Sequence, residues 1–474
     1  MRLSAVFFTL GLFLLVLALA MVIPCLAAYA VGETEIGFAF FGAAIFTTFV
    51  GGGLVLSLTG PTRRSGVREA VILLVLAWTV LPLFAMIPML ASGWPGEFLP
   101  AFFEAVSALT TSGATQYQDG SGAPSSIILW RSILHWIGGF GGLLAAAAVL
   151  TGVAATALPV HTVIVPHLER DALLARLMPM GLVLGPAYML LTLLIIIGLL
   201  VSGLSPFDAL CLGLSAIATG GASARGAEIS LYQSGFVEIT VMVAVMIGAI
   251  SFATHTAAMR GKINAYTKDP ETLWLLGTVT VVVIALWAFG RDVDAWAGAF
   301  TALSLVTTSG YYHDGALGGL PPALVFTLVL LGGSIISTAG GIKMMRMIML
   351  WNQSRRELSR LARPHSIAHR RVLGRPITAA LLEPVWVYFV ALATAITFLA
   401  LMLSFALPSF EMAAGAAVAA ITNTGPSFHL AFPDAPGYGE FSNLGLGTLC
   451  VGMILGRIEI IALPILLTGS FWRF

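Results

Sequence analysis

Four short segments of this chain resemble one another, and each follows an apolar run too short to cross a membrane. Each segment is rich in Thr, Ser or Asn and has a glycine at the same place. The segments are ALTTSGAT (108–115), AIATGGAS (216–223), LVTTSGYY (305–312) and AITNTGPS (420–427). Apolar runs of about 10–14 residues favour re-entrant helices over spans. Irregular backbone at membrane depth persists only where protein or a watery cavity satisfies its polar groups. The sequence therefore predicts four loops that meet at one shared cavity.

The composition places the chain in a lipid bilayer. Of its 474 residues, 58% are hydrophobic and 9% are charged, whereas soluble domains carry about 25% charged residues. The cysteines Cys25, Cys211 and Cys450 all lie in apolar runs without paired spacing, so we expect small buried side chains rather than disulfides or a metal site. The sequence has no HExxH or GxSxG motif, and no paired aspartates in facing spans. We therefore expect no enzyme and no bound cofactor.

The chain divides into two opening spans and four related units. Residues 1–60 form the two N-terminal transmembrane helices, and each unit then reads span, polar stop, half-length segment, glycine loop, span. The units are residues 69–152, 177–260, 271–351 and 377–474, with a basic cytoplasmic linker at 352–376. This is a long-period internal repeat. We predict an all-α polytopic membrane protein with ten spans and four pore helices, arranged with pseudo-fourfold symmetry around one central pore.

The distribution of charge predicts the orientation. The span alternation puts 19 of the 23 Lys and Arg residues on one side, which the positive-inside rule makes cytoplasmic together with both termini. Fourteen of the 22 acids fall on the outer side, among them Glu104 and Asp208. An acidic mouth concentrates cations, although acids also cross membranes with little penalty. Arg225 at the outer mouth is awkward for a cation pathway, and we expect it to pair with Glu228 or another acid.

The glycine loops have the chemistry of a cation filter. A cation that enters a narrow pore loses its water, and rings of backbone carbonyls replace that shell. Glycine permits the unusual backbone angles that such a loop needs, and the C-terminal ends of the half-length helices favour a cation. The alternative is ordinary close packing of small residues between spans. The predicted filter residues are Thr111, Ser112, Gly113, Thr219, Gly220, Gly221, Thr308, Ser309, Gly310, Asn423, Thr424 and Gly425.

Two further features predict a gate below the filter. The second span of the third unit is interrupted by LGGSIISTAGGIK (331–343), where each interior glycine costs about 1 kcal/mol relative to alanine, and broken helices in transporters usually line the pathway. Arg457 lies within the last span, where a charge is by default a functional candidate. The alternatives are a close-packed helix face for the first and an ion pair with Glu459 for the second. The predicted gate residues are Arg457, Gly332, Gly333, Ser337, Thr338, Gly340 and Gly341.

The four loops resemble the selectivity filters of the Trk/Ktr/HKT superfamily of potassium transporters. WRSILHWIGGFG (130–141), STAGGIKMMR (337–346), ILGRIEI (454–460) and the terminal FWRF agree with that resemblance, which covers essentially the whole chain. The two extra N-terminal spans make the chain look more like the bacterial TrkH subunits than like KtrB. In that superfamily the interrupted segment is an intramembrane loop that obstructs the pore, and an arginine at the place of Arg457 gates it. Ile335 and Ile336 depart from the small residues common there, which predicts a stiffer or more apolar constriction.

The resemblance also implies partners and a location. It implies a bacterial inner-membrane protein that forms one pore per chain, usually assembles as a homodimer, and carries a cytosolic ring of TrkA-like regulatory subunits. The regulatory nucleotide is expected on that partner, while K⁺ is the substrate at the filter residues, and no nucleic acid is expected. The basic residues between 343 and 375 suit either anionic lipid headgroups or this partner.

The leading hypothesis is thus gated, potassium-selective uptake through a channel-like pore. The alternatives are an ion-coupled secondary transporter of a small organic solute and a K⁺/Na⁺ pathway of lower selectivity. A solute transporter usually has two inverted repeats, whereas this chain has four parallel ones.

Overall fold

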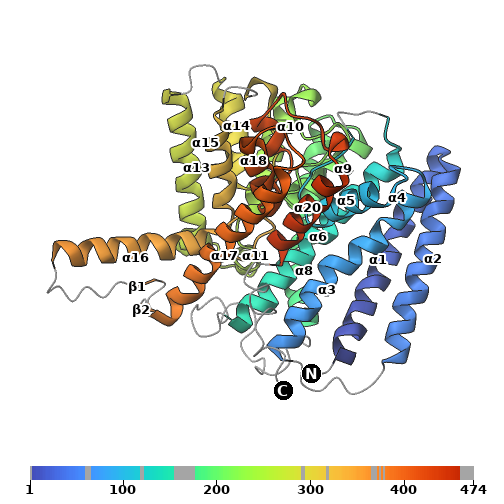
Figure 1. Cartoon of the computed structure of the whole chain (residues 1–474), viewed down its shortest axis with the longest axis horizontal. Coiled ribbons are helices and arrows are strands. Elements are labelled where there is room, and N and C mark those ends of the chain that lie inside the picture. The colour runs from blue at the N-terminus through green and yellow to red at the C-terminus, as the bar shows by residue number, and fades with distance from the viewer. Residues whose placement is uncertain are drawn as a thin grey trace.

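The structure is a computed structural model (Figure 1), and it describes residues 3–58, 66–117, 122–153, 177–289, 294–316, 320–363, 371–372, 375–376 and 379–458. These residues are helical apart from turns and one antiparallel pair of two-residue strands, β1 (Arg371–Val372) and β2 (Arg375–Pro376). The predicted all-α class is confirmed. Glu459 lies outside the described residues, as does the C-terminal FWRF.

The first two helices form an antiparallel hairpin. α1 (Leu3–Val31) and α2 (Thr34–Ser57) have almost no charged residues, as a span requires. They pack closely at Gly11 and Gly51, where a Cβ atom on either glycine would lie 2.9–3.0 Å from the carbonyl oxygen of the other. Small residues at a crossing let two membrane helices approach in this way, so the pair forms a rigid flank of the bundle (Figure 1).

The remaining helices can be grouped by the predicted units, whose division of the chain stays a prediction. The first unit contains α3 (Val67–Ala85), α4 (Ile87–Ala91), α5 (Phe98–Leu109) and α6 (Ser125–Val153), and the second contains α8 (Leu177–Val201), α9 (Pro206–Ile217), η2 (Ser230–Tyr232), α10 (Gly235–Ala249) and α11 (Phe252–Met259). After α12 (Ala265–Lys268), the third contains α13 (Pro270–Phe289), α14 (Ala295–Val306), η3 (Asp314–Ala316), α15 (Pro322–Leu331) and α16 (Met344–Ala362). The fourth contains α17 (Ala379–Leu403), α18 (Phe410–Ile421), α19 (Ser427–Ala431), η4 (Tyr438–Glu440) and α20 (Asn443–Arg457).

The four half-length segments form helices of equal length. α5, α9, α14 and α18 each have twelve residues. Three of them begin at a side-chain cap: Ser205, Asp294 and Ser409 each accept a hydrogen bond from a backbone N–H of the first turn. Such caps satisfy donors that the helix itself leaves unpaired. The helices therefore start at defined points and deliver their C-terminal ends to the interior.

Within the described residues, not all of the ten expected spans are continuous helices. In the described part of the chain, seven helices are long and apolar enough to cross a membrane, and an eighth span is the pair α10 and α11, bent by 98°. The sequence analysis drew that span as continuous, but the chain is extended at Ile250, which ends α10. The third unit's second span stops at Leu331 after ten residues. α20 has fifteen residues and ends where the description ends.

The basic linker predicted at 352–376 begins inside a helix. α16 runs without a break from Met344 to Ala362, across the predicted boundary. Its first turns are buried through Met345, Ile348 and Met349, whereas Leu361 is exposed. Figure 1 shows α16 extending away from the helical bundle. The change from apolar to charged residues at this point therefore marks where α16 leaves the bundle, and the helix itself ends later, at Ala362.

Candidate functional site

The four half-length helices end in the same backbone motif. In each, the backbone N–H of the second residue after the helix donates to the carbonyl oxygen three residues earlier, as Thr111 does to Ala108 (3.1 Å). The N–H of the following residue donates to the carbonyl oxygen five residues earlier, as Ser112 does to Ser107 (2.8 Å). The other three pairs are Thr219 to Ala216 with Gly220 to Ser215, Thr308 to Leu305 with Ser309 to Ser304, and Asn423 to Ala420 with Thr424 to Ala419. This is the Schellman helix end, which normally has glycine at the left-handed residue.

Here the left-handed residue is not glycine. Thr111, Thr219, Thr308 and Asn423 have φ of 51–56°. A β-branched residue is rare in this region and costs about 1–3 kcal/mol, so it persists only where the surroundings hold it. The sequence analysis assigned the unusual backbone to the glycines and missed these four positions.

Of the four glycines that lie two residues further along the loops, three have a left-handed backbone and one does not. Gly113, Gly221 and Gly310 have φ of 74°, 62° and 78°. Gly425 does not share this conformation, and Pro426, which follows it, is the N-cap of the short helix α19. The fourth loop therefore departs from the others at the position where the sequences look most alike.

Contacts between the glycine loops close into a ring. We number the loops 1 to 4 (residues 110–114, 218–222, 307–311 and 422–426). A Cβ atom on the glycine of each loop would collide with, or closely approach, the next loop: Gly113 meets the Gly220 carbonyl, Gly221 the Ser309 carbonyl, Gly310 the Pro426 ring at 3.0 Å, and Gly425 the Ala114 backbone. Loop 4 also bonds loop 1 directly, from the Gly425 N–H to the Ser112 oxygen (2.6 Å). The predicted filter residues of all four loops are thus brought together.

Hydroxyl groups behind the ring hold the loops in shape. In loop 1 the Ser107 hydroxyl donates to the Ala114 oxygen (2.6 Å), and in loop 2 the Ser215 hydroxyl accepts from the Ala222 N–H (3.1 Å). Ser304 bonds Ser309 in loop 3 (2.8 Å). These serines share the same place, two residues before the end of their helices. Sequence reasoning missed them, although that common position was a signal.

The predicted acidic mouth is wrong for Glu104. That carboxylate is fully buried and lies 2.9 Å from Arg131 Nε. It also accepts bonds from the Thr115 hydroxyl (3.1 Å) and the Gln116 N–H (2.7 Å), just after loop 1. A buried carboxylate requires such pairing. Glu104 therefore anchors loop 1 and does not face the outer solution.

Arg225 and its neighbours also neutralise one another. Its guanidinium lies 3.5 Å from Asp208 and stacks 4.9 Å from the Tyr232 ring centre. Glu228, the partner named first from the sequence, instead accepts from the Ser230 hydroxyl (2.6 Å). Burial raises the pKa of the Tyr232 phenol to about 12, so this outer cluster carries no phenolate at neutral pH.

Beneath the ring, the interrupted segment 332–343 connects α15 to α16. Its backbone bonds the bend between α10 and α11: Ser334 N–H to Ala249 O (2.8 Å), Thr338 N–H to Gly248 O (3.0 Å) and Phe252 N–H to Ile336 O (2.7 Å). Two breaks in separate spans thereby satisfy each other's polar groups, which hydrocarbon cannot do.

Two buried features fix the start of this segment. Ile335 and Ile336 belong to the same apolar cluster as Phe252, so their side chains are packed against the bend between α10 and α11. The Ile335 N–H also donates to the Glu271 carboxylate (3.2 Å) in the first turn of α13. Glu271 is 5% exposed, and the sequence analysis had assigned it no role.

The interrupted segment contacts the bases of loops 2, 3 and 4. The Thr338 hydroxyl donates to the Ile217 oxygen (3.0 Å) at the end of α9, under loop 2. The Gly340 N–H donates to the Thr308 hydroxyl (2.6 Å) of loop 3, and Gly340 leaves no room for a side chain against the Thr422 oxygen of loop 4. Of the predicted gate residues, Thr338 and Gly340 therefore touch the ring directly, while Gly332 and Gly341 pack against each other with φ of 73° and 71°.

Arg457 links the interrupted segment to loop 1. Its Nε donates to the Thr110 oxygen (2.7 Å), Nη2 donates to the Thr111 hydroxyl, and Nη1 donates to the Thr338 oxygen (2.9 Å). The residue is 8% exposed. Among the residues that the structure describes, no carboxylate pairs with it. Its charge therefore sits directly below the ring and is satisfied by neutral oxygens.

These features define a polytopic membrane protein whose four re-entrant loops meet above an interrupted span. A family model described as "Cation transport protein" matches residues 36–290 and 292–473, and the chain belongs to this TrkH family. The resemblance seen in the sequence is confirmed, and the family is one of transport proteins rather than enzymes.

Individual relatives agree over their full lengths. The chain is 30% identical to the Trk system potassium uptake protein TrkH of Halomonas elongata over 490 residues, covering 100% of both. It is 29% identical to the Trk system potassium uptake protein TrkG of Escherichia coli, covering 96% of both. A crystal structure of the potassium transporter TrkH from Vibrio parahaemolyticus matches with a TM-score of 0.87 at 27% identity, covering 100% of both chains.

Proposed function

We propose that this chain carries K⁺ into the cell across the bacterial inner membrane, through a gated pore that passes the ring of glycine loops. Backbone oxygens of Thr111, Ser112, Gly113 and their counterparts in the other loops replace the water that K⁺ loses. The observation that carries the proposal is the closed ring of contacts between four loops with the same helix end. The names of the relatives support K⁺ as the ion.

The gate in this proposal is the interrupted segment together with Arg457. Thr338 and Gly340 lie against the loops, with Gly332, Gly333, Ser337 and Gly341 in the same segment, so ions pass only when this segment moves. The Arg457 charge adds a barrier to a cation below the ring. Movement of either element opens the path.

Regulation and assembly complete the proposal. The cytoplasmic side carries most of the Lys and Arg residues, so both termini are cytoplasmic by the positive-inside rule. By resemblance the chain forms a homodimer and binds a TrkA-like ring, which carries the regulatory nucleotide. The charge on α16 suits an acidic surface of that partner.

The test is uptake of rubidium into proteoliposomes that contain the purified protein. Excess K⁺ should block Rb⁺ uptake. Uptake that K⁺ leaves unchanged would contradict a potassium pathway and favour a carrier for an organic solute. With such a carrier, other monovalent cations would not compete with Rb⁺ for uptake.

A substitution locates the selectivity in the ring. Gly113→Ser places a side chain in the left-handed region against the Gly220 oxygen, so the K⁺ to Na⁺ permeability ratio should fall. Gly122→Ser is the matched control, because Gly122 has φ of 72° with no atom within 4 Å of a Cβ. Equal ratios in Gly113→Ser and wild type would count against the filter.

A further inference from the structure

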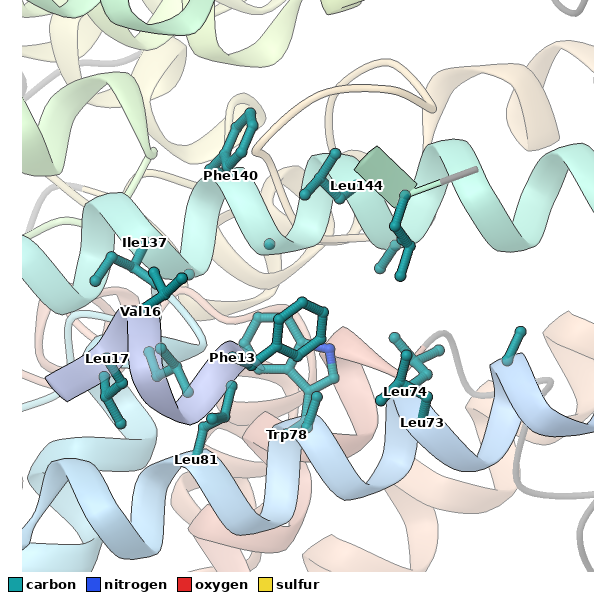
Figure 2. A pocket seen from close by; sticks show the side chains of 17 residues that line it. Phe13, Val16, Leu17, Leu73, Leu74, Trp78, Leu81, Ile137, Phe140 and Leu144 are labelled. Atoms are coloured by element: carbon teal, nitrogen blue, oxygen red, sulfur yellow. The ribbon is translucent and has the colours of Figure 1, made fainter. Parts of the chain in front are cut away.

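A cavity of about 260 Å³ lies behind the ring, between α1, α3 and α6 (Figure 2). Figure 2 shows Trp78 and Leu81 of α3 on the side of α6 that carries Ile137, with Phe13 of α1 beside them. All of the side chains that line it are apolar apart from the single indole N–H of Trp78. The volume is slightly below the range of about 300–1,000 Å³ for pockets that hold a drug-sized ligand. It suits one slender hydrocarbon chain.

The surroundings of the cavity determine what can fill it. A buried water needs two to four polar partners, and this lining does not provide them. Val16, which lines the cavity, is also 57% exposed on the outer surface of α1. Because α1 is a membrane span, that surface faces lipid hydrocarbon. Lipid acyl chains therefore lie next to the cavity at Val16.

Charge at one end of the cavity favours an anionic headgroup. Ala70 lines the cavity one turn into α3. Arg68 lies on the first turn of the same helix and is exposed. Basic residues next to a span attract anionic lipids by about 1 kcal/mol each.

The cavity wall is also the support of loop 1 and Arg457. Leu109 lines the cavity and precedes Thr110, whose carbonyl accepts the Arg457 Nε bond. On α6, Gly138 packs directly against the Leu109 carbonyl, and a Cβ atom on Gly142 would lie 3.1 Å from Arg457 Nη1. An occupant of the cavity therefore presses on the helix turns that hold the ring and the gate arginine.

We propose that this cavity binds one acyl chain of an anionic phospholipid, with the headgroup at the basic start of α3, as a lipid site behind loop 1. Trp78 reports on the site directly. It is 4% exposed, so bulk lipid does not reach it, whereas a chain in the cavity touches it.

The experiment uses phosphatidylglycerol brominated on its acyl chains, because bromine quenches tryptophan fluorescence at contact. The protein is reconstituted in brominated or plain lipid, and the Trp78 contribution is the difference between wild type and Trp78→Phe, since the chain has 10 tryptophans. We expect the Trp78 contribution to be lost in brominated phosphatidylglycerol. If the Trp78 fluorescence is equally strong in brominated and in plain lipid, the proposed lipid site is wrong.

Variants and a second lipid sharpen the result. Gly141 lines the cavity, and no atom lies within 4 Å of a Cβ there, so Gly141→Leu should fill it and restore the Trp78 fluorescence. Gly53→Leu on α2 is the matched control, because Gly53 is also free of neighbours but does not line the cavity, and quenching should persist. Where Gly141→Leu does not fold, Ala77→Phe fills the cavity from α3. Quenching that persists in the filled variant overturns the proposal.

The headgroup is tested by adding brominated phosphatidylcholine or brominated phosphatidylglycerol as a minor component to plain lipid. Stronger quenching by the anionic lipid supports the proposed orientation. Equal quenching by both lipids overturns the headgroup assignment. None of these measurements depends on ion flux, so their outcome is separate from that of the proposed transport function.

Discussion

Replacing Arg457 by Ala removes a side chain that joins the interrupted segment to loop 1. Its bonds to Thr110 and Thr111 connect α20 to loop 1, and its bond to the Thr338 oxygen connects α20 to the interrupted segment. A hydrogen bond from a charged group contributes about 1.5–3 kcal/mol. The balance between the seated and the displaced segment should therefore shift about tenfold to a hundredfold, since about 1.4 kcal/mol corresponds to a factor of ten.

Rb⁺ uptake into proteoliposomes measures this shift. While the displaced segment is a small minority, the uptake rate of Arg457→Ala should rise by the same factor, and then level off. Arg457→Gln separates the two contributions of the arginine, because it removes the charge but keeps one N–H₂ donor. If the barrier is mainly electrostatic, Gln and Ala should give equal rates. If the bond to the segment dominates, the Gln variant should lie between Ala and wild type.

Arg225→Gln is the control for loss of a positive charge elsewhere on the pathway. Its guanidinium pairs with Asp208 and makes no contact with the interrupted segment, so uptake should change little. Unchanged or slower uptake by Arg457→Ala, in protein that elutes as wild type does, would refute the reasoning. Arg457 would then be a structural tie between α20 and loop 1.

Two further pairs of substitutions test the neighbouring contacts. Thr308→Val removes the acceptor of the Gly340 N–H. Because a buried donor without a partner costs about 1–3 kcal/mol, the seated segment is destabilised and Rb⁺ uptake should rise. Thr307→Val loses only bonds within its own helix and loop and should leave uptake unchanged. Gly138→Ala places a Cβ atom on the carbonyl at the end of α5 and should lower the thermal unfolding temperature in detergent, since overpacking costs about 1–3 kcal/mol. Gly141→Ala meets no atom and should keep or raise it, since alanine favours a helix by about 1 kcal/mol; equal unfolding temperatures of the two alanine variants would contradict the packing argument.

The features that local sequence controls were predictable. A half-length helix was expected before each glycine loop, and α5, α9, α14 and α18 occur there, because an apolar run that ends in a polar, Gly-containing turn leaves little choice. The interruption after Leu331 follows from its glycines in the same way. Length, apolarity and glycine content act within a few residues, so one sequence suffices to read them.

The features that depend on distant partners were not predictable. Gly248 lies two residues before the bend at Ile250, but a single glycine does not predict a bend. The bend is held because the Gly248 and Ala249 carbonyls bond the interrupted segment, about 90 residues away in the chain. Glu104 looked like an outer-surface acid because its partner Arg131 belongs to a different helix. When two irregular segments or two charged side chains pair with each other across the fold, the sequence shows each of them separately and does not show that they are partners.

The four loop glycines also show that one sequence signal can have two physical causes. Positions 113, 221 and 310 require glycine for two reasons, a left-handed backbone and close contact with the next loop. Gly425 needs it only for contact, because its backbone is not left-handed and its N–H bonds the Ser112 oxygen. A carbonyl oxygen has two lone pairs, so Ser112 can accept this bond and still present its other lone pair to a cation. The ring is therefore chemically unequal: three loops present the same conformation, and the fourth braces loop 1.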